Sequence, residues 1–207
     1  MTLLADYHQP LSEVLQEVAD LPSERISVAE LTERFGGRAM GALLLIFGLL
    51  CLLPLPPGAT TVFGLPLLLL SPQLVWGRHA PWLPQRVRHR MIPIDDMRAT
   101  LPRVIRWLRR VESFSQPRLT FLFGPVGERL IGVVCTLLAF VLILPIWGGN
   151  FLPATAVTVL ALSLILKDGV LAIVGYLLAV TSGVVLTLAA HIIIRMFQHA
   201  WAALAGA

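Results

Sequence analysis

The sequence predicts an all-α integral membrane protein made of two tandem repeats and a C-terminal apolar helix. Each repeat contains amphipathic helices and an apolar helical hairpin that is broken by proline and glycine. Hydrophobic residues make up 57% of the 207 residues, charged residues make up 14%, and the mean hydropathy is +0.80. Soluble domains average about 45–50% apolar and about 25% charged residues. Residues 169–194 contain no Asp, Glu, Lys or Arg, and about 20 such residues cross a bilayer as a helix. We therefore expect one membrane domain over residues 1–207.

Two short amphipathic helices are predicted before the first apolar stretch. Residues 11–21 place apolar side chains on one helical face. Ser27 and Glu30 have the spacing of a capping box, which predicts a helix through Phe35 that ends at Gly36. Both helices are too short and too charged to cross a bilayer, so we expect them at its surface. The first 21 residues hold four acidic side chains, so no cleavable signal peptide is expected.

The first apolar element, residues 40–70, is interrupted at residues 54–58 by three prolines and a glycine, which stop a helix. Residues 41–53 give about 20 Å of helix, less than the roughly 30 Å hydrocarbon core. Two arrangements are open: a tilted pair of spanning helices, or a re-entrant hairpin whose break lies inside the membrane. We favour the re-entrant hairpin.

An arginine-rich arm follows at residues 77–118, with ten arginines against three acidic residues. Basic segments beside apolar spans mark the cytoplasmic side and attract anionic lipid headgroups. Within the arm, residues 102–111 alternate between apolar and arginine faces, which predicts a helix on the membrane surface. No aromatic and basic recognition motif accompanies the arginines, so nucleic acid is not an expected partner.

The second apolar element repeats the first. Residues 130–144 are apolar, residues 145–150 form a Pro/Gly-containing break, and residues 151–166 are apolar again. Residues 169–195 then form either one membrane helix or a hairpin bent at residues 181–183. At an offset of 91, five residues find identical partners without a gap: Gly36, Arg38, Gly41, Pro54 and Gly58 fall on Gly127, Arg129, Gly132, Pro145 and Gly149.

This match predicts one repeat at about residues 10–90 and a second at about residues 101–168. Parallel repeats are favoured over inverted ones, because the arm between them offers no clean additional crossing. Small residues such as Gly41 and Gly132 permit close helix contact, either within one chain or across a homodimer.

The breaks are the best candidates for a ligand site. Broken helices in membrane transporters meet near the midplane and expose N–H groups that hold ligands. The polar or backbone-exposing residues there, together with the arginines that open the apolar arms, give the candidate ligand-binding set: Arg38, Gly58, Thr60, Thr61, Arg129, Gly149, Asn150 and Thr155. Alternatively, the break residues only satisfy one another, and the arginines are headgroup anchors. No catalytic motif, metal site or cofactor site is expected.

The ordered motifs over residues 10–190 resemble the ExoD family of bacterial membrane proteins, which is linked by name to exopolysaccharide synthesis. The motifs are Gly37-Arg38, Leu53-Pro54-Leu55-Pro56-Pro57-Gly58, Val62-Phe63-Gly64-Leu65-Pro66-Leu67, Pro81-Trp82-Leu83-Pro84, Glu128-Arg129-Leu130-Ile131-Gly132, Pro145 with Gly149-Asn150 and Pro153, and Asp168-Gly169.

The resemblance implies a non-enzymatic, multi-pass protein of the bacterial inner membrane that supports exopolysaccharide synthesis or export alongside other exopolysaccharide machinery. Such a protein could bind or pass a lipid-linked glycan. Two alternatives are a secondary transporter or ion exchanger with its site at the paired breaks, and an enzyme acting on a lipid-linked sugar.

Overall fold

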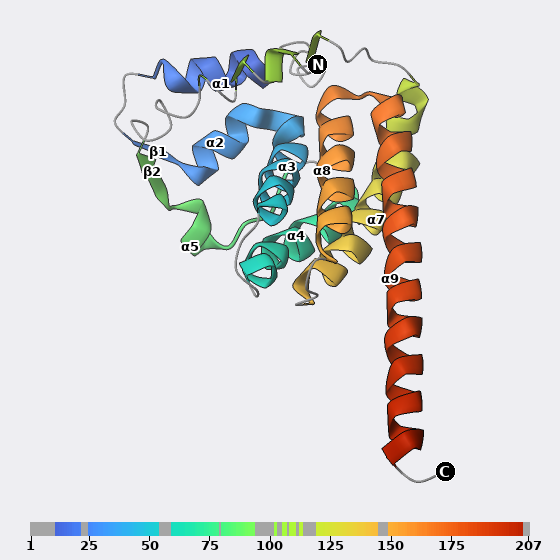
Figure 1. Cartoon of the computed structure of the whole chain (residues 1–207). Coiled ribbons are helices and arrows are strands. Elements are labelled where there is room, and N and C mark those ends of the chain that lie inside the picture. Colours follow the sequence, from blue (N-terminus) through green and yellow to red (C-terminus); the bar gives the residue numbers. More distant parts are fainter. Residues whose placement is uncertain are drawn as a thin grey trace.

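The computed structural model describes residues 11–21, 25–53, 59–78, 80–93, 102, 105–106, 108–110, 112–113, 119–144 and 149–204. The described part is helical apart from one pair of three-residue strands. Figure 1 shows short helices and the strand pair beside a central group of apolar helices, and one long helix that extends far beyond them. The predicted helical class is confirmed, whereas the strand pair was not predicted.

The N-terminal region contains α1 (Leu11–Ala19), β1 (Arg25–Ser27), α2 (Val28–Phe35) and the 3-10 helix η1 (Gly36–Arg38). Ser27 caps α2, because its Oγ accepts the N–H of Glu30 at 3.1 Å. Gly36 ends α2 with a φ of 52°, a conformation that glycine adopts without strain. The predicted cap and end of this helix are therefore confirmed.

β1 pairs antiparallel with β2 (Met91–Pro93), with Ile26 opposite Ile92. Ile26 and Val18 are buried together in a small core beside α1 and α2. This pairing joins the first half of the arginine-rich arm to the N-terminal region. Strands of three residues are too short to show a periodic pattern in the sequence. In addition, the paired residues of β1 and β2 are more than 60 residues apart, so no local signal links them.

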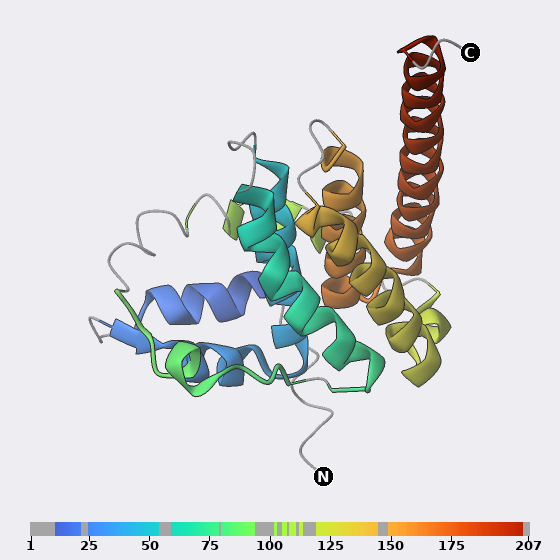
Figure 2. The same ribbon diagram turned by 90° about the horizontal axis from the view of Figure 1, so that it is seen from below.

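Four apolar helices form the main core: α3 (Ala39–Leu52), α4 (Ala59–Val75), α7 (Pro125–Ile143) and α8 (Phe151–Leu166). α4 packs against α7, and α3 packs against α8. Figure 2 shows these helices together in the middle of the molecule. The short helices α5 (Gln85–Arg88) and η2 (Thr120–Phe123) lie in the segment between α4 and α7.

α4 continues through Pro66 and Pro72. Two side chains supply hydrogen bonds around Pro72. Ser71 Oγ donates to the carbonyl of Leu67 at 2.7 Å, and Gln73 Nε2 donates to the carbonyl of Leu69 at 3.0 Å. Such bonds let proline persist in apolar helices, because they satisfy backbone groups that lipid cannot.

Glycines allow the closest helix contacts within this chain. A Cβ on Gly41 of α3 would lie 2.9 Å from Ile165 Cγ1 of α8. A Cβ on Gly132 of α7 would lie 2.8 Å from Val75 N of α4. Both glycines are therefore used for packing inside one chain.

The arginine-rich arm packs against α1. The described residues between 102 and 113 are helical, with Ile105 and Leu108 buried and Arg106, Arg109 and Arg110 exposed, in agreement with the predicted amphipathic pattern. Leu108 belongs to the main core, so this apolar face is turned toward protein. Ser12 Oγ donates to Glu112 Oε2 at 2.6 Å, which ties the arm to α1.

The last helix, α9 (Gly169–Leu204), is continuous through residues 181–183. It packs against α8 and extends far beyond the end at which α8 begins (Figure 1). Within the described part, three helical segments are long and apolar enough to cross a membrane. They are Val28–Leu52, which combines α2, η1 and α3, Pro125–Ile143, which is α7, and Gly169–Ile192 of α9. Thr60–Val75 and Phe151–Leu166 are shorter apolar helices.

Candidate functional site

The predicted ligand-binding residues fall into two groups at opposite ends of the main core. Thr60, Thr61, Gly149 and Asn150 lie where α4 and α8 begin. Arg38 immediately precedes α3, and Arg129 lies in the second turn of α7. Both arginines are thus near the starts of α3 and α7, whereas the breaks follow the ends of these two helices. The 14 residues of α3 separate the two groups by about 20 Å. Gly58 lies outside the described residues.

At the breaks, the start of α4 is bonded to the end of α7 and the start of α8. Asn150 Nδ2 donates to Thr60 Oγ1 at 2.9 Å and to the Leu144 carbonyl at 3.4 Å. Thr61 Oγ1 donates to the Ile143 carbonyl at 2.8 Å. The two breaks are therefore joined by polar side chains, as expected if broken arms meet.

Asn150 stands at the N-cap position of α8 but does not cap the helix. Asparagine normally caps from an extended conformation, with its side-chain oxygen accepting an N–H of the first turn. Here Asn150 has helical backbone angles, φ −80° and ψ −14°, and its side chain makes no cap hydrogen bond. Its amide nitrogen is committed to Thr60 in the other half of the chain.

Among the residues that the structure describes, the Asn150 side-chain oxygen has no partner. The residue is 9% exposed, and Oδ1 is buried without a hydrogen bond to any of them. A buried acceptor in this state costs about 1–3 kcal/mol. Ala154 N bonds to Asn150 O, and Pro153 has no N–H, so Phe151 and Leu152 carry the N–H groups of the first turn without intrahelical partners.

A second buried hydroxyl lies at the same level of the fold. Ser182 of α9 is 1% exposed, and its Oγ has no hydrogen-bond partner in the described part of the chain. A Cβ on Gly175 of α9 would meet Leu160 of α8, which fixes the register of these antiparallel helices. The same register places Ser182 beside the first turn of α8. Ser182 was not among the predicted site residues, because a single serine in a long apolar helix does not by itself indicate a ligand site.

The remaining break residues contribute less. Gly149 is half-buried in the turn before α8. Thr155 Oγ1 donates to the Phe151 carbonyl of its own helix at 2.7 Å, so its hydroxyl is committed locally. The structure therefore joins Thr60, Thr61 and Asn150 into one cluster, adds Ser182 at the same level, and leaves Thr155 outside it.

The opposite end of the core holds a charged cluster around Glu128. This residue is buried in the first turn of α7 and forms an ion pair with Lys167, the C-cap of α8. Lys167 Nζ also lies 5.4 Å from the Phe123 ring centroid, within cation–π distance. A cavity of about 20 Å³, enough for one water molecule, is lined by Arg38, Glu128 and Lys167 among others.

The Glu128–Lys167 pair was not predicted. Lys167 is the only lysine of the chain, and Glu128 and Asp168 are the only acidic residues after Glu112. The start of α7 and the end of α8 lie at the same end of the core, so the charged residues at these two helix ends come together. Arg129 is exposed beside Gly77 and lines an adjoining cavity of about 270 Å³ with Phe123 and Pro125.

Comparisons with known proteins identify one family. A family described as "Exopolysaccharide synthesis, ExoD" matches residues 11–188. The chain is 29% identical over 185 residues to Protein ExoD of Rhizobium meliloti, covering 86% of this chain and 77% of that protein. It is 30% identical over 151 residues to an uncharacterized protein of Synechocystis, covering 72% and 71% respectively. No solved structure matches this chain.

Proposed function

Since this chain belongs to the ExoD family of exopolysaccharide synthesis proteins, we propose that it is a non-enzymatic protein of the bacterial inner membrane that binds or passes a hydroxyl-rich ligand, such as a lipid-linked glycan, at its paired breaks. Family membership gives the role in exopolysaccharide synthesis. The molecular step rests on one observation, which is the buried Asn150 oxygen beside the uncapped start of α8.

The polar groups at the breaks match a hydroxyl ligand. Asn150 Oδ1 accepts a hydrogen bond, whereas the first-turn N–H groups of α8 and α4 donate. A sugar hydroxyl both donates and accepts, so it satisfies the two kinds of group together. Ser182 Oγ adds a group that can do either. A simple anion would satisfy the N–H groups but would repel the Asn150 oxygen.

The depth of the breaks supports a site enclosed in the membrane. α9 runs antiparallel to α8, and Gly175 lies against Leu160, so the start of α8 falls near residue 184 of α9. The apolar sequence of α9 continues to Ile194, about 15 Å further at 1.5 Å per residue. This register supports re-entrant hairpins, with their breaks below the far membrane surface.

A parallel repeat is part of the same proposal. Gly41 and Gly132 correspond at an offset of 91, and their contacts Ile165 and Val75 correspond at an offset of 90. Each glycine packs against the β-branched residue of the other half, as a two-fold axis along the membrane normal requires. Equivalent arms therefore approach the same axis, and both breaks point to the same side.

The test is exopolysaccharide output in a bacterial host whose own family member is deleted and replaced by variants of this chain. Asn150→Ala and Thr60→Val should each lower the output at least tenfold at unchanged membrane levels of the protein. Thr155→Val is the matched control, because its hydroxyl bonds only to its own helix, and it should leave the output unchanged. Full output from Asn150→Ala would refute the site.

A second candidate function is ion exchange, which the buried Glu128–Lys167 pair favours. Intramembrane or membrane-edge charge pairs are frequent in proton and ion pathways. Purified protein in liposomes with a pH-sensitive dye tests this function directly. Proton flux that is lost in Glu128→Gln but kept in Asn150→Ala would favour ion exchange over glycan binding.

A further inference from the structure

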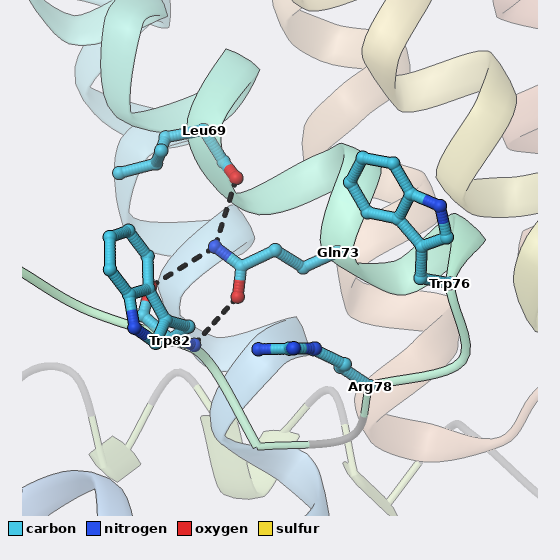
Figure 3. A pocket seen from close by; sticks show the side chains of 5 residues that line it. All are labelled: Leu69, Gln73, Trp76, Arg78 and Trp82. Carbon is cyan, nitrogen blue, oxygen red and sulfur yellow. Dashed lines mark hydrogen bonds between the residues drawn. The ribbon is translucent and has the colours of Figure 1, made fainter.

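The end of α4 and the start of the arginine-rich arm enclose a pocket that is separate from the breaks and from the charged cluster. It has a volume of about 710 Å³ and is lined by Leu69, Gln73, Trp76, Arg78 and Trp82. Figure 3 shows the two indole rings on opposite sides of Gln73, with the Arg78 side chain running below Gln73 toward Trp82. We expect the pocket at the membrane surface next to the arm, because the apolar helix α4 ends at Val75.

One wall of the pocket is held in place by a buried side chain. Gln73 is 7% exposed, and its amide forms two hydrogen bonds with the backbone of Trp82 (Figure 3). Trp82 N donates to Gln73 Oε1 at 2.6 Å, and Gln73 Nε2 donates to the Trp82 carbonyl at 3.1 Å. These bonds fix the second tryptophan opposite Trp76 although it follows an irregular loop. The pocket is therefore formed before any ligand arrives.

The charge that Arg78 brings to the pocket is positive. Its backbone N–H donates to the Gln73 carbonyl at 3.0 Å. Within the described part of the chain, its guanidinium has no hydrogen bond or ion pair, whereas Arg34 and Arg88 pair with Glu30 and Glu33. A guanidinium suits phosphate oxygens, to which it donates two parallel hydrogen bonds. Indole N–H groups are further donors, and tryptophan rings favour the headgroup level of a bilayer.

An apolar stripe leads from the pocket into the membrane. Val62, Leu65 and Leu69 are large exposed side chains at helical spacing on one face of α4, and exposed Trp76 follows one residue beyond the end of the helix. From Val62 to Trp76 the stripe is about 21 Å long, enough to carry an acyl chain through one leaflet of a roughly 30 Å core. Leu69 belongs both to the stripe and to the pocket. A ligand with a polar head and an apolar tail fits this surface along its length.

We propose that the Trp76–Arg78–Trp82 pocket is a binding site for an anionic phospholipid, with the phosphate on Arg78, the headgroup between the two indoles and an acyl chain along the exposed face of α4. This site is independent of the hydroxyl-ligand site at the breaks. It is also more specific than the general attraction of the arginine-rich arm to anionic membranes, because it assigns selectivity to one arginine among ten.

Purified full-length protein is titrated with phosphatidylglycerol, and bound lipid is counted by native mass spectrometry, with phosphatidylcholine as the zwitterionic comparison. The wild-type chain should bind phosphatidylglycerol at least tenfold more tightly than phosphatidylcholine. Arg78→Gln should bring the two lipids to similar affinity. Arg86→Gln is the matched control, because Arg86 is an exposed arginine of the same arm that does not line the pocket, and it should keep the preference.

Equal losses in Arg78→Gln and Arg86→Gln would overturn the site in favour of diffuse surface charge. Competition by millimolar inorganic phosphate would overturn the lipid as its occupant.

A second measurement leaves the residues of the pocket unchanged. In a Trp107→Phe, Trp147→Phe, Trp201→Phe background, brominated phosphatidylglycerol should quench the remaining Trp76 and Trp82 fluorescence more than brominated phosphatidylcholine does. Equal quenching by the two lipids would contradict the proposal.

Discussion

At the scale of single residues, the sequence identified the chemistry at the breaks but not its geometry. Thr60, Thr61 and Asn150 were chosen as polar groups among apolar arms, and the structure bonds them to one another or to the facing helix. No sequence pattern reveals that Asn150 turns away from its own helix and leaves its oxygen unpaired. That outcome depends on how two halves of the chain, 90 residues apart, meet in space.

A substitution at Ser182 should have opposite effects on the stability of the protein and on its function. Its hydroxyl is buried without a hydrogen bond, so Ser182→Ala removes an unsatisfied group and should raise the free energy of unfolding by up to about 1 kcal/mol. If the hydroxyl binds ligand, the same variant lowers exopolysaccharide output severalfold. Denaturant unfolding in detergent and output in the deletion host measure the two effects. A more stable and fully active variant would remove Ser182 from the site.

The close-packed glycines give a second residue-scale prediction. A Cβ at Gly132 meets the backbone nitrogen of Val75 at 2.8 Å, which the fixed helix cannot avoid. Gly132→Ala should therefore lower the free energy of unfolding by about 1–3 kcal/mol. Gly183→Ala, where a Cβ meets nothing within 4 Å, is the matched control and should be neutral or stabilising. Equal effects at both positions would contradict the packing.

The Glu128–Lys167 pair predicts a non-additive result. Glu128→Gln leaves the partly buried ammonium of Lys167 without this carboxylate and should lower the free energy of unfolding by roughly 3 kcal/mol. This value is at the lower end for buried pairs, because the Lys167 side chain is 25% exposed. Lys167→Met in the same chain should recover most of that loss. Unfolding free energies of the two single variants and the double variant give the coupling. Additive losses would show that the pair is not an energetic unit.

At the scale of elements, apolar periodicity and caps predicted the helices well, whereas isolated prolines do not end α4. Three prolines and a glycine within five residues predicted an interruption, and α3 ends at Leu52 directly before them. Pro66 and Pro72 stand alone, and Ser71 and Gln73 supply hydrogen bonds around the second of them. Isolated prolines are thus tolerated in apolar helices when neighbouring side chains satisfy the backbone.

The Gln73 clamp is testable through the segment that it holds. Gln73→Leu removes both hydrogen bonds to Trp82 and should release the segment that leads to α5. Trypsin should then cleave at Arg86, Arg88 or Arg90 severalfold faster than in the wild-type chain. Gln85→Leu, an exposed glutamine on α5, is the matched control. Unchanged cleavage in Gln73→Leu would mean that the strand pairing with β1 alone holds this segment.

At the scale of the whole molecule, family membership, a helical fold and helices long and apolar enough to cross a membrane could be predicted from sequence. The strand pair, the burial of the arm helix against α1 and the Glu128–Lys167 contact could not, because each joins residues far apart in the chain. The repeat remains a prediction that the reciprocal glycine contacts support. In its favour, α1 and the arm helix, which correspond in the two halves, pack against each other.

The depth of the breaks decides the central claim that they form a site inside the membrane. Single cysteines at Leu53, Gly149 and Gln198, in a Cys51→Ala, Cys135→Ala background, are treated with a membrane-impermeant thiol reagent from the side opposite the arginine-rich arm. Gln198→Cys, near the far end of α9, should react quickly. Leu53→Cys and Gly149→Cys should react at least tenfold more slowly until detergent is added. Equal rates at all three positions would make the hairpins ordinary spanning helices and would contradict the enclosed site.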